Sequence, residues 1–523
     1  MICYGQNLNF NINKIMSLAL VYSRTNDGIH APQVMVEVDL SAGLPGVSIV
    51  GLPETAVKES KDRVRAAIIN SRFEFPNNKR ITINLAPADI PKDGGRFDLP
   101  IALGILAASG QIPEQALAEY EFIGELSLGG ELRKVKGVLP TAFAADKKQR
   151  SLFVPEENAA EASLISSLAV YTANHLLKIT EHLNDTQRLS PYEPINTREN
   201  QEYSVDLNEV KGQFQAKRAL EIAAAGSHNM LMIGPPGTGK TMLATRLATI
   251  LPPMTDEEAL ESATIASISN QGFNYQQWGQ RPVREPHHTC SGVALVGGGS
   301  HVRPGEISLA HNGVLFLDEL TEFDRKVLEV LREPLETGKI TISRAARQAT
   351  YPAKFQLITA MNPCPQGYDC DLKDNCQCSL EQQRRYRSKL SAPFLDRIDL
   401  QIEVPRLSRE DLQRPEESET SETVRQRVIK AREIQLQRQG AANRFLGNKA
   451  MEKYCQLSLQ DEALIAQVLE KFKLSARAYH RILKVARTIA DLAGSNNIET
   501  LHLSEAVSYR SMDRLIAAQA PAS

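Results

Sequence analysis

A glycine-rich run near the middle of the chain has the residue types and spacing of a phosphate-binding loop. It follows the pattern G-x-x-x-x-G-K-[ST] between an apolar stretch at 229–233 and a stretch of helical character at 242–250. Glycines let the backbone approach oxyanions, and N–H groups at a helix start attract negative charge. The loop consists of Gly234, Pro235, Pro236, Gly237, Thr238, Gly239, Lys240 and Thr241. We expect Lys240 to reach the terminal phosphates of a nucleotide such as ATP, and Thr241 to bind its Mg²⁺.

Two further apolar stretches end in polar side chains that suit the same chemistry. Residues 314–317 are followed by Asp318 and Glu319, and residues 355–361 are followed by Asn362. Because parallel strands end at one edge of a sheet, these side chains are expected beside the phosphates. We expect Asp318 to hold Mg²⁺ through water, Glu319 to polarise the attacking water, and Asn362 to orient it. A turn residue before a proline is the simpler interpretation of Asn362.

Two arginines are candidates for stabilising the charge that develops on a transferred phosphoryl group. Arg397 is predicted between a helix end and a new strand, from where it can point out of the subunit. Arg477 is predicted to open a helix that can close over the nucleotide as part of a lid. An exposed surface arginine is an equal alternative for each of them.

Composition indicates the general class of protein but does not point to a particular partner. The chain has 523 residues and a formal net charge of -2, so two or three domains are expected and no overall charge points to nucleic acid or membrane. No stretch is long and apolar enough to span a bilayer, which predicts a soluble, cytoplasmic protein. Seven cysteines, four of them clustered, do not form the pattern of a secreted disulfide framework.

Alternating strand and helix patterns predict an α/β protein with a helical C-terminal part. A polar, proline-bearing stretch without periodicity separates two α/β regions and is the expected linker. The expected parts are a disordered extension at 1–15, an α/β domain at 16–182, a linker at 183–202, an α/β nucleotide-binding core at 203–405, and a helical lid at 406–523 with a disordered end.

The order of these motifs, with several longer stretches, resembles a known family. The stretches are 284–289 (REPHHT), 297–299 (GGG), 303–313 (RPGEISLAHNG) and 361–365 (MNPCP). They are similar to the magnesium-chelatase-like AAA+ ATPases of the ComM/YifB type, and the resemblance runs from Met16 to about residue 510. It implies a hexameric, ATP-driven DNA helicase that promotes branch migration in natural transformation, together with recombination proteins.

The resemblance also implies a role for each candidate residue. It assigns Lys240 and Thr241 to phosphate and Mg²⁺, Asp318 and Glu319 to metal and water, Asn362 to the first sensor, Arg397 to the arginine finger and Arg477 to the second sensor.

The first α/β domain is similar to the peptidase domain of Lon proteases around residues 91–98, 124–128 and 137–140. Where that family carries its nucleophilic serine, this chain has Arg96, and where it carries the lysine base, this chain has Leu139 or Thr141. Without a nucleophile and a base there is no route to acyl transfer. We therefore expect a fold kept for assembly or DNA contact, without proteolysis.

A cluster of cysteines follows Asn362. Four thiolates can bind Zn²⁺ tetrahedrally and fix a polar loop, but their spacing departs from the usual paired C-x2-C. Free thiols in a mobile loop are the equal alternative. The cluster consists of Cys364, Cys370, Cys376 and Cys378.

DNA contact is expected from local features. A predicted hairpin at 340–353 carries Arg344 and Arg347 at or near its tip, where arginines can grip phosphates without reading bases. A solvated hairpin tip is the simpler interpretation. The second candidate is the glycine loop, which consists of Gly297, Gly298 and Gly299. His287 and His288 are expected to be structural or part of an inserted helix, with metal binding as the less favoured alternative. The basic run at 384–389 is expected at a subunit interface or in solvent.

Two other functions compete with a DNA motor. One is the motor subunit of a metal chelatase that inserts Mg²⁺ into a porphyrin, whose close relatives lack the Lon-like domain. The other is an ATP-dependent protease, which Arg96 and the missing lysine disfavour.

Overall fold

A computed structural model gives the fold of most of the chain. It describes residues 18–194, 203–299, 302–344, 347–367, 378–407, 418–472 and 474–510. The expected extension at 1–15, the end of the chain after 510, Cys370 and Cys376 lie outside these ranges. The chain forms two compact units, one of Met1–Thr197 with Ala266–Gln276 and one of Arg198–Ile265 with Gln277–Ser523.

The first unit is built on a seven-stranded mixed sheet with the order β3-β4-β2-β1-β5-β8-β9. Its middle strands alternate buried and half-buried residues, as expected for one face on the core, and pair antiparallel in the order β1, β2, β4. The strands are β1 (Leu18–Arg24), β2 (Gln33–Ser41), β3 (Gly46–Val50), β4 (Arg80–Ala86), β5 (Tyr120–Phe122), β8 (Ser151–Pro155) and β9 (Val170–Ala173).

Helices cover this sheet and complete the first core. Helix α3 (Asp98–Ala108) is buried along almost its whole length, because apolar residues occupy every side of it. Two further helices, α1 (Thr55–Lys58) and α2 (Ser60–Asn70), follow β3. Helices α4 (Val138–Asp146) and α6 (Leu176–Leu183) follow later in the chain.

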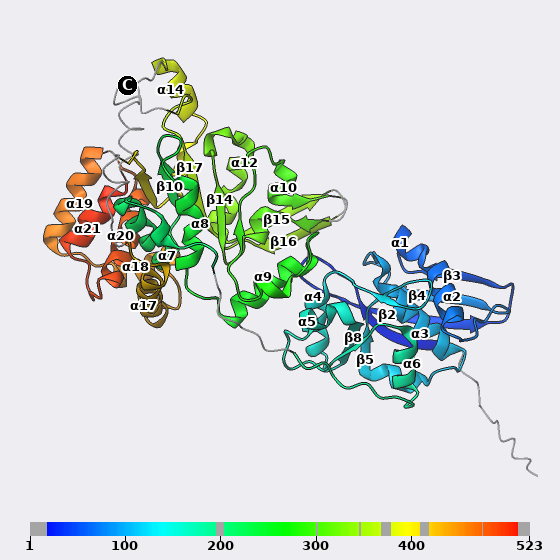
Figure 1. The fold of residues 1–523 in the computed structure, drawn as a ribbon. Coiled ribbons are helices and arrows are strands. Elements are labelled where there is room, and N and C mark those ends of the chain that lie inside the picture. Colours follow the sequence, from blue (N-terminus) through cyan, green and yellow to red (C-terminus); the bar gives the residue numbers. More distant parts are fainter. Residues whose placement is uncertain are drawn as a thin grey trace, which may run out of the picture. The chain divides into compact units, whose positions relative to one another are not determined.

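The second unit is built on a five-stranded parallel sheet with the order β11-β14-β17-β10-β18. The three strands in its middle are short, apolar and fully buried, as is typical of a parallel sheet covered on both faces. This confirms the expected α/β fold and its phosphate-loop core (Figure 1). The strands are β10 (Met230–Ile233), β11 (Val283–Arg284), β14 (Val314–Leu317), β17 (Gln356–Met361) and β18 (Leu400–Glu403).

The C-terminal part is helical, as expected, and lies beside helix α7 (Phe214–Gly226) of the same unit (Figure 1). Apolar residues of these helices share one hydrophobic core with the parallel sheet. We call this part the lid. Its helices are α17 (Ser421–Gln439), α18 (Asn448–Tyr454), α19 (Leu459–Phe472), α20 (Ala476–Leu492) and α21 (Thr500–Ser508). In the described part of the chain, no helix is long and apolar enough to cross a membrane.

Two small two-stranded sheets flank the parallel sheet. One pairs β12 (Gly297–Gly298) with β13 (Arg303–Pro304), after the short helix α10 (Gly292–Val296). The other is the expected hairpin, in which β15 (Lys339–Arg344) pairs antiparallel with β16 (Arg347–Pro352).

Candidate active site

The phosphate loop connects the end of β10 to helix α8 (Lys240–Ile250), as its sequence predicts. Gly237 and Gly239 have φ angles of 77° and 89°, a left-handed conformation that favours glycine. Gly234 is packed so closely that an added Cβ would lie 2.2 Å from the carbonyl oxygen of Val404. Each of these three glycines is therefore required by the backbone itself.

Lys240 is held inside this loop. Its Nζ donates to the carbonyl oxygens of Gly234 at 2.7 Å and Pro235 at 3.0 Å, and to Oδ1 of Asn362 at 3.2 Å. Burial lowers the pKa of Lys240, while the charges of Asp318 and Glu319 oppose that shift. The structure thus brings together Lys240 and Asn362, which are far apart in the sequence.

Thr241 and Asp318 form the pair that suits a magnesium ion. The Thr241 hydroxyl donates to Oδ2 of Asp318 at 2.6 Å, and the other carboxylate oxygen accepts from the N–H of Glu319 at 2.8 Å. Oxygen ligands from a hydroxyl and a carboxylate beside phosphates are those that Mg²⁺ prefers. These residues fit a Mg²⁺ ion that would neutralise the charge on the phosphates of ATP.

Glu319 has a histidine partner that the sequence did not reveal. The Glu319 backbone is left-handed, with φ of 51°, and Nδ1 of His288 lies 3.1 Å from Oε2 of Glu319. The His287 ring lies 4.2 Å from the His288 ring, centroid to centroid. His288 follows β11, the strand beside β14, and only this sheet order places it near Glu319.

Tyr386 holds the backbone at Asn362. It lies in helix α14 (Leu380–Arg387), is buried, and donates its hydroxyl to the Asn362 carbonyl at 3.2 Å. Tyr386 belongs to the basic run at 384–389, which the sequence placed in solvent or at an interface. Through Tyr386 this run also anchors helix α14 to Asn362, the predicted first sensor.

Arg397 lies at the N-terminal ends of the parallel strands, whereas the phosphate loop lies at their C-terminal ends. It stands just before β18, and in the parallel register Leu400 of β18 is paired with Met230 at the start of β10, whereas the loop follows Ile233 at its end. The length of β10 alone separates the two ends by about 13 Å. Arg397 therefore cannot serve its own phosphate loop without a large rearrangement.

The Arg397 side chain is buried within its own subunit. It donates to the Pro393 carbonyl and pairs with Glu336 of helix α13 (Arg332–Thr337), whose side chain is 55% exposed. Burial lowers the pKa of Arg397; the charge of Glu336 opposes this shift, and nearby arginines add to it. Those neighbours are Arg332, Arg477 and Arg481.

Arg477 lies in the first turn of α20 and is exposed. Arg477 precedes Arg481 by one turn of α20, and Nη1 of Arg481 lies 3.5 Å from the Arg397 carbonyl oxygen, so the two predicted arginines lie near each other. The candidate residues thus form two groups: the phosphate, magnesium and first-sensor residues lie at the C-terminal ends of the parallel strands, and Arg397 and Arg477 lie near their N-terminal ends.

Comparison with known proteins gives the family of this arrangement. Residues 206–412 match the family described as "Magnesium chelatase, subunit ChlI", residues 36–158 match "Subunit ChlI of Mg-chelatase", and residues 418–510 match "Magnesium chelatase, subunit ChlI C-terminal". The "Competence protein ComM" of Haemophilus influenzae is 53% identical, over 96% of this chain and 99% of that protein. The chain belongs to the magnesium-chelatase-like AAA+ family of the ComM/YifB type.

Other relatives agree with this assignment. The "Uncharacterized protein YifB" of Escherichia coli is 50% identical over 96% of this chain and 98% of that protein. The "DNA replication licensing factor Mcm6" of Drosophila melanogaster is 25% identical over 39% of this chain and 25% of that protein. The AAA+ family and the phosphate-loop site together support an ATPase that uses ATP and Mg²⁺.

The two candidate DNA-binding elements of this AAA+ protein are adjacent. Gly297 has φ of 103°, and an added Cβ would lie 2.3 Å from the carbonyl oxygen of Arg303 and 2.7 Å from the side chain of Ile342 in the hairpin. The structure describes the backbone of Arg344 and Arg347, which are paired in register at the hairpin end. DNA contact at either element stays a prediction.

Two of the four clustered cysteines are described. The Sγ atoms of Cys364 and Cys378 lie 3.8 Å apart. Among the described residues there is no group of three or more side chains that could hold a metal ion. Because Cys370 and Cys376 lie outside the described residues, zinc at this cluster stays a prediction.

In the first unit, Arg96 is buried where the peptidase resemblance puts the nucleophile. Its guanidinium donates to Oδ1 of Asn26 and to the Lys136 carbonyl, each at 2.7 Å, and burial lowers the pKa of Arg96 to about 10. Leu139 and Thr141 lie buried in α4, which begins directly after this contact. The absence of peptidase activity stays a prediction.

Proposed function

We propose that the chain is an ATP-driven motor that acts on DNA as a ring of identical subunits. The main support is the separation of Arg397 and Lys240, which lie at opposite ends of the strands of one parallel sheet. A subunit with this arrangement needs the arginine of a neighbour to complete its site, and such head-to-tail contacts close into rings. Six subunits, as the family resemblance implies, are the expected number.

In this proposal Arg397 and Arg477 both act on the nucleotide of the adjacent subunit. Arg477 lies one turn of α20 before Arg481, which contacts the Arg397 carbonyl, and this proximity supports a shared target because a γ-phosphate in the transition state carries charge on several oxygens. Within the same subunit, Glu319 would polarise the attacking water and Asn362 would orient it.

The substrate we propose is branched DNA during homologous recombination of incoming DNA in natural transformation. Support comes from the 53% identity to a competence protein over nearly the full length, and from the similarity to a replication licensing factor. The glycine loop and the arginine hairpin, which lie side by side, are the proposed DNA contacts. Recombination proteins would be its partners.

Two activity measurements test this proposal. ATP hydrolysis should rise when branched DNA is added, and labelled four-way junctions should be converted to duplex products only with ATP. Lys240→Ala, which removes the phosphate ligand, is the control for both. Hydrolysis that single-stranded, duplex and branched DNA all leave unchanged would contradict the proposal.

The matched family descriptions favour one alternative, the motor subunit of a magnesium chelatase. Such a motor would act through partner subunits on a porphyrin. ATP hydrolysis that ignores DNA but rises with chelatase partner subunits would support this alternative instead.

A zinc ion at the cysteine cluster is a subsidiary proposal. Two thiolates on one tetrahedral zinc with bonds of about 2.3 Å have sulfurs roughly 3.8 Å apart, the separation found for Cys364 and Cys378. Two thiols in simple contact fit the same distance. Metal analysis of the purified protein decides between them, and the absence of stoichiometric zinc would exclude the ion.

A further inference from the structure

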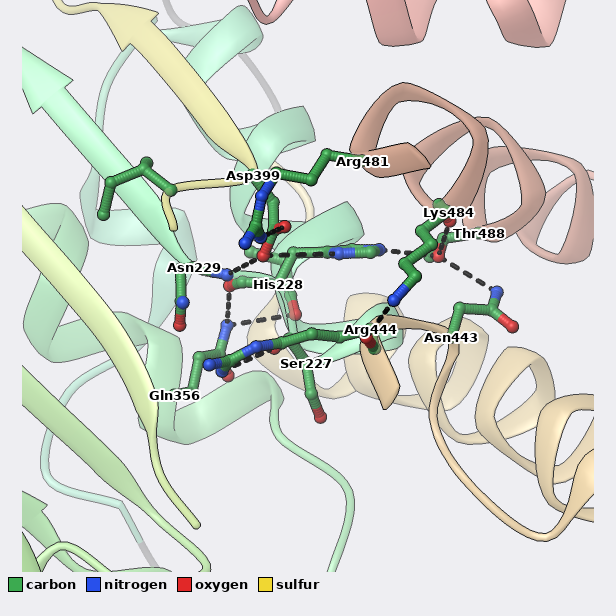
Figure 2. Close-up of polar contacts among 12 residues, drawn as sticks. Ser227, His228, Asn229, Gln356, Asp399, Asn443, Arg444, Arg481, Lys484 and Thr488 are labelled. Carbon is green, nitrogen blue, oxygen red and sulfur yellow. Dashed lines mark hydrogen bonds and ion pairs between the residues drawn. The ribbon is translucent and has the colours of Figure 1, made fainter. Parts of the chain in front are cut away.

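A buried ion pair joins the lid to the segment that carries Arg397. Arg481 of α20 pairs through Nη1 with Asp399 (Figure 2). The same nitrogen lies 3.5 Å from the Arg397 carbonyl oxygen. Asp399 is fully buried, and the Arg481 side chain is 22% exposed. Arg481 follows Arg477 by one helical turn, so both lie on the same face of α20.

The opposite side of this segment is fixed to the strand that leads to the phosphate loop. The Asn229 side chain donates to the Arg397 carbonyl at 2.8 Å, and its backbone N–H donates to Oδ2 of Asp399 at 2.8 Å. The side-chain oxygen of Asn229 accepts from the N–H of Leu357 in β17 at 2.9 Å. Asn229 therefore ties β10, β17 and the Arg397 segment together.

Further polar contacts hold α20 against the same edge of the sheet. His228, which is fully buried, contacts the Thr488 hydroxyl at 2.8 Å through Nε2, as Figure 2 shows. Lys484 donates to the Arg444 carbonyl at 3.0 Å, and Arg444 in turn donates to the Phe355 carbonyl at 3.0 Å. Because Arg481, Lys484 and Thr488 extend over about two turns, α20 and the core are connected at more than one point.

Asp399 is held as an ionised carboxylate by the charges around it. Burial by itself would raise the pKa of Asp399, but the charge of Arg481, with His228 and Arg444, holds it well below its usual value. An ionised, buried carboxylate of this kind accepts only a narrow range of positions for its partners.

We propose that Arg481 and Asp399 are positioning residues for Arg397. They fix the backbone of the predicted arginine finger to the lid helix and to the strand that leads to the phosphate loop of the same subunit. A shift of the lid would therefore move the arginine that serves the neighbour. The inference rests on the proposed function, because it assumes that Arg397 acts on an adjacent subunit.

The test is Arg481→Ala in the full-length chain. We expect kcat for ATP hydrolysis to fall at least tenfold, with KM changed less than twofold, because the variant's own phosphate loop is intact. Arg481→Lys keeps the charge and should recover part of the loss. The double variant Arg397→Ala/Arg481→Ala should be no slower than Arg397→Ala alone, because Arg481 acts on catalysis only by positioning the Arg397 side chain.

Mixed rings separate positioning from a general structural role. Lys240→Ala subunits have no working site of their own but carry an intact finger, so mixing them equally with Arg481→Ala subunits should restore about a quarter of the sites in a randomly assembled ring. A mixture as inactive as its two components would overturn the proposal.

Arg438→Ala is the matched control. Arg438 pairs with Asp491 inside the lid, and the two side chains are 18% and 0% exposed, close to the values of the Arg481 pair. It should lower the melting temperature to a similar extent while leaving kcat within about twofold. Equal kcat in the Arg481→Ala and Arg438→Ala variants would overturn the inference, whereas full activity of Arg397→Ala would contradict the proposed function itself.

Discussion

The guanidinium of Arg397 is paired with Glu336 of its own chain, although its predicted target is the nucleotide of a neighbour. This pair competes with that target. Because Glu336 is more than half exposed, solvent screens the pair, and the Arg397 guanidinium keeps its contact with the Pro393 carbonyl when Glu336 is removed. Arg397 therefore has a partner that it can leave when a neighbouring phosphate attracts it.

Glu336→Gln should accordingly raise the rate of ATP hydrolysis. A pair with one partner in solvent contributes about 1 kcal/mol, so kcat should rise by about fivefold. Steady-state ATPase assays check this, with Glu333→Gln on the same helix as the control. A loss of activity as large as that of Arg397→Ala would mean that Glu336 supports the finger instead of competing for it.

His288→Ala should lower kcat about tenfold with little change in KM, because the Glu319 carboxylate loses the partner that orients it. His288→Gln, which keeps a donor, should lose less. ATPase assays at saturating Mg²⁺ measure both variants. Unchanged kcat in His288→Ala would show that Glu319 is oriented by other groups.

Asp318→Asn should weaken the use of Mg²⁺ more than the binding of nucleotide. Thr241 and Asp318 are placed to hold the ion together, so the variant should need more Mg²⁺ for half-maximal activity and lose about a hundredfold or more in kcat. Binding of a fluorescent ATP analogue in EDTA should be unaffected. Glu322→Gln, on the exposed surface nearby, is the control. An equal Mg²⁺ requirement in the wild-type protein, Asp318→Asn and Glu322→Gln would refute the assignment of Asp318 to Mg²⁺.

Asp399→Asn should destabilise the second unit in a pH-dependent way. The folded protein holds the pKa of Asp399 below its ordinary value of 3.8, so the ionised carboxylate stabilises the fold above that pH and loses this effect as the pH falls toward the folded pKa. At pH 7 the variant should be less stable by about 3 kcal/mol, since Arg481 loses its buried partner. Chemical denaturation at pH 7 and pH 3 measures the difference, which should shrink at pH 3; a constant difference would contradict the account.

The sequence predicted those parts of the site that depend on local pattern. Lys240, Asp318 and Asn362 each come after a short apolar strand, and parallel strands of this kind bring the residues at their carboxyl ends to one edge of the sheet. Local periodicity likewise predicted that the C-terminal part of the chain is helical.

The remaining contacts depend on pairs that are remote in the sequence. Arg397 and Glu336 are 61 residues apart, and Asp399 and Arg481 are 82 apart. Nothing in a charged helix marks which of its residues will meet a given partner. The position of Arg477 beside Arg397 could not be predicted either, because it depends on how α20 packs against the core.

The central claim is that each ATP site is completed by an arginine of the adjacent subunit. Mixing Arg397→Ala subunits, which retain Lys240, with Lys240→Ala subunits, which retain Arg397, tests it most directly. The account predicts that two inactive proteins regain appreciable ATP hydrolysis when they assemble together. A mixture that stays inactive at every ratio, although the subunits form joint rings, would contradict it.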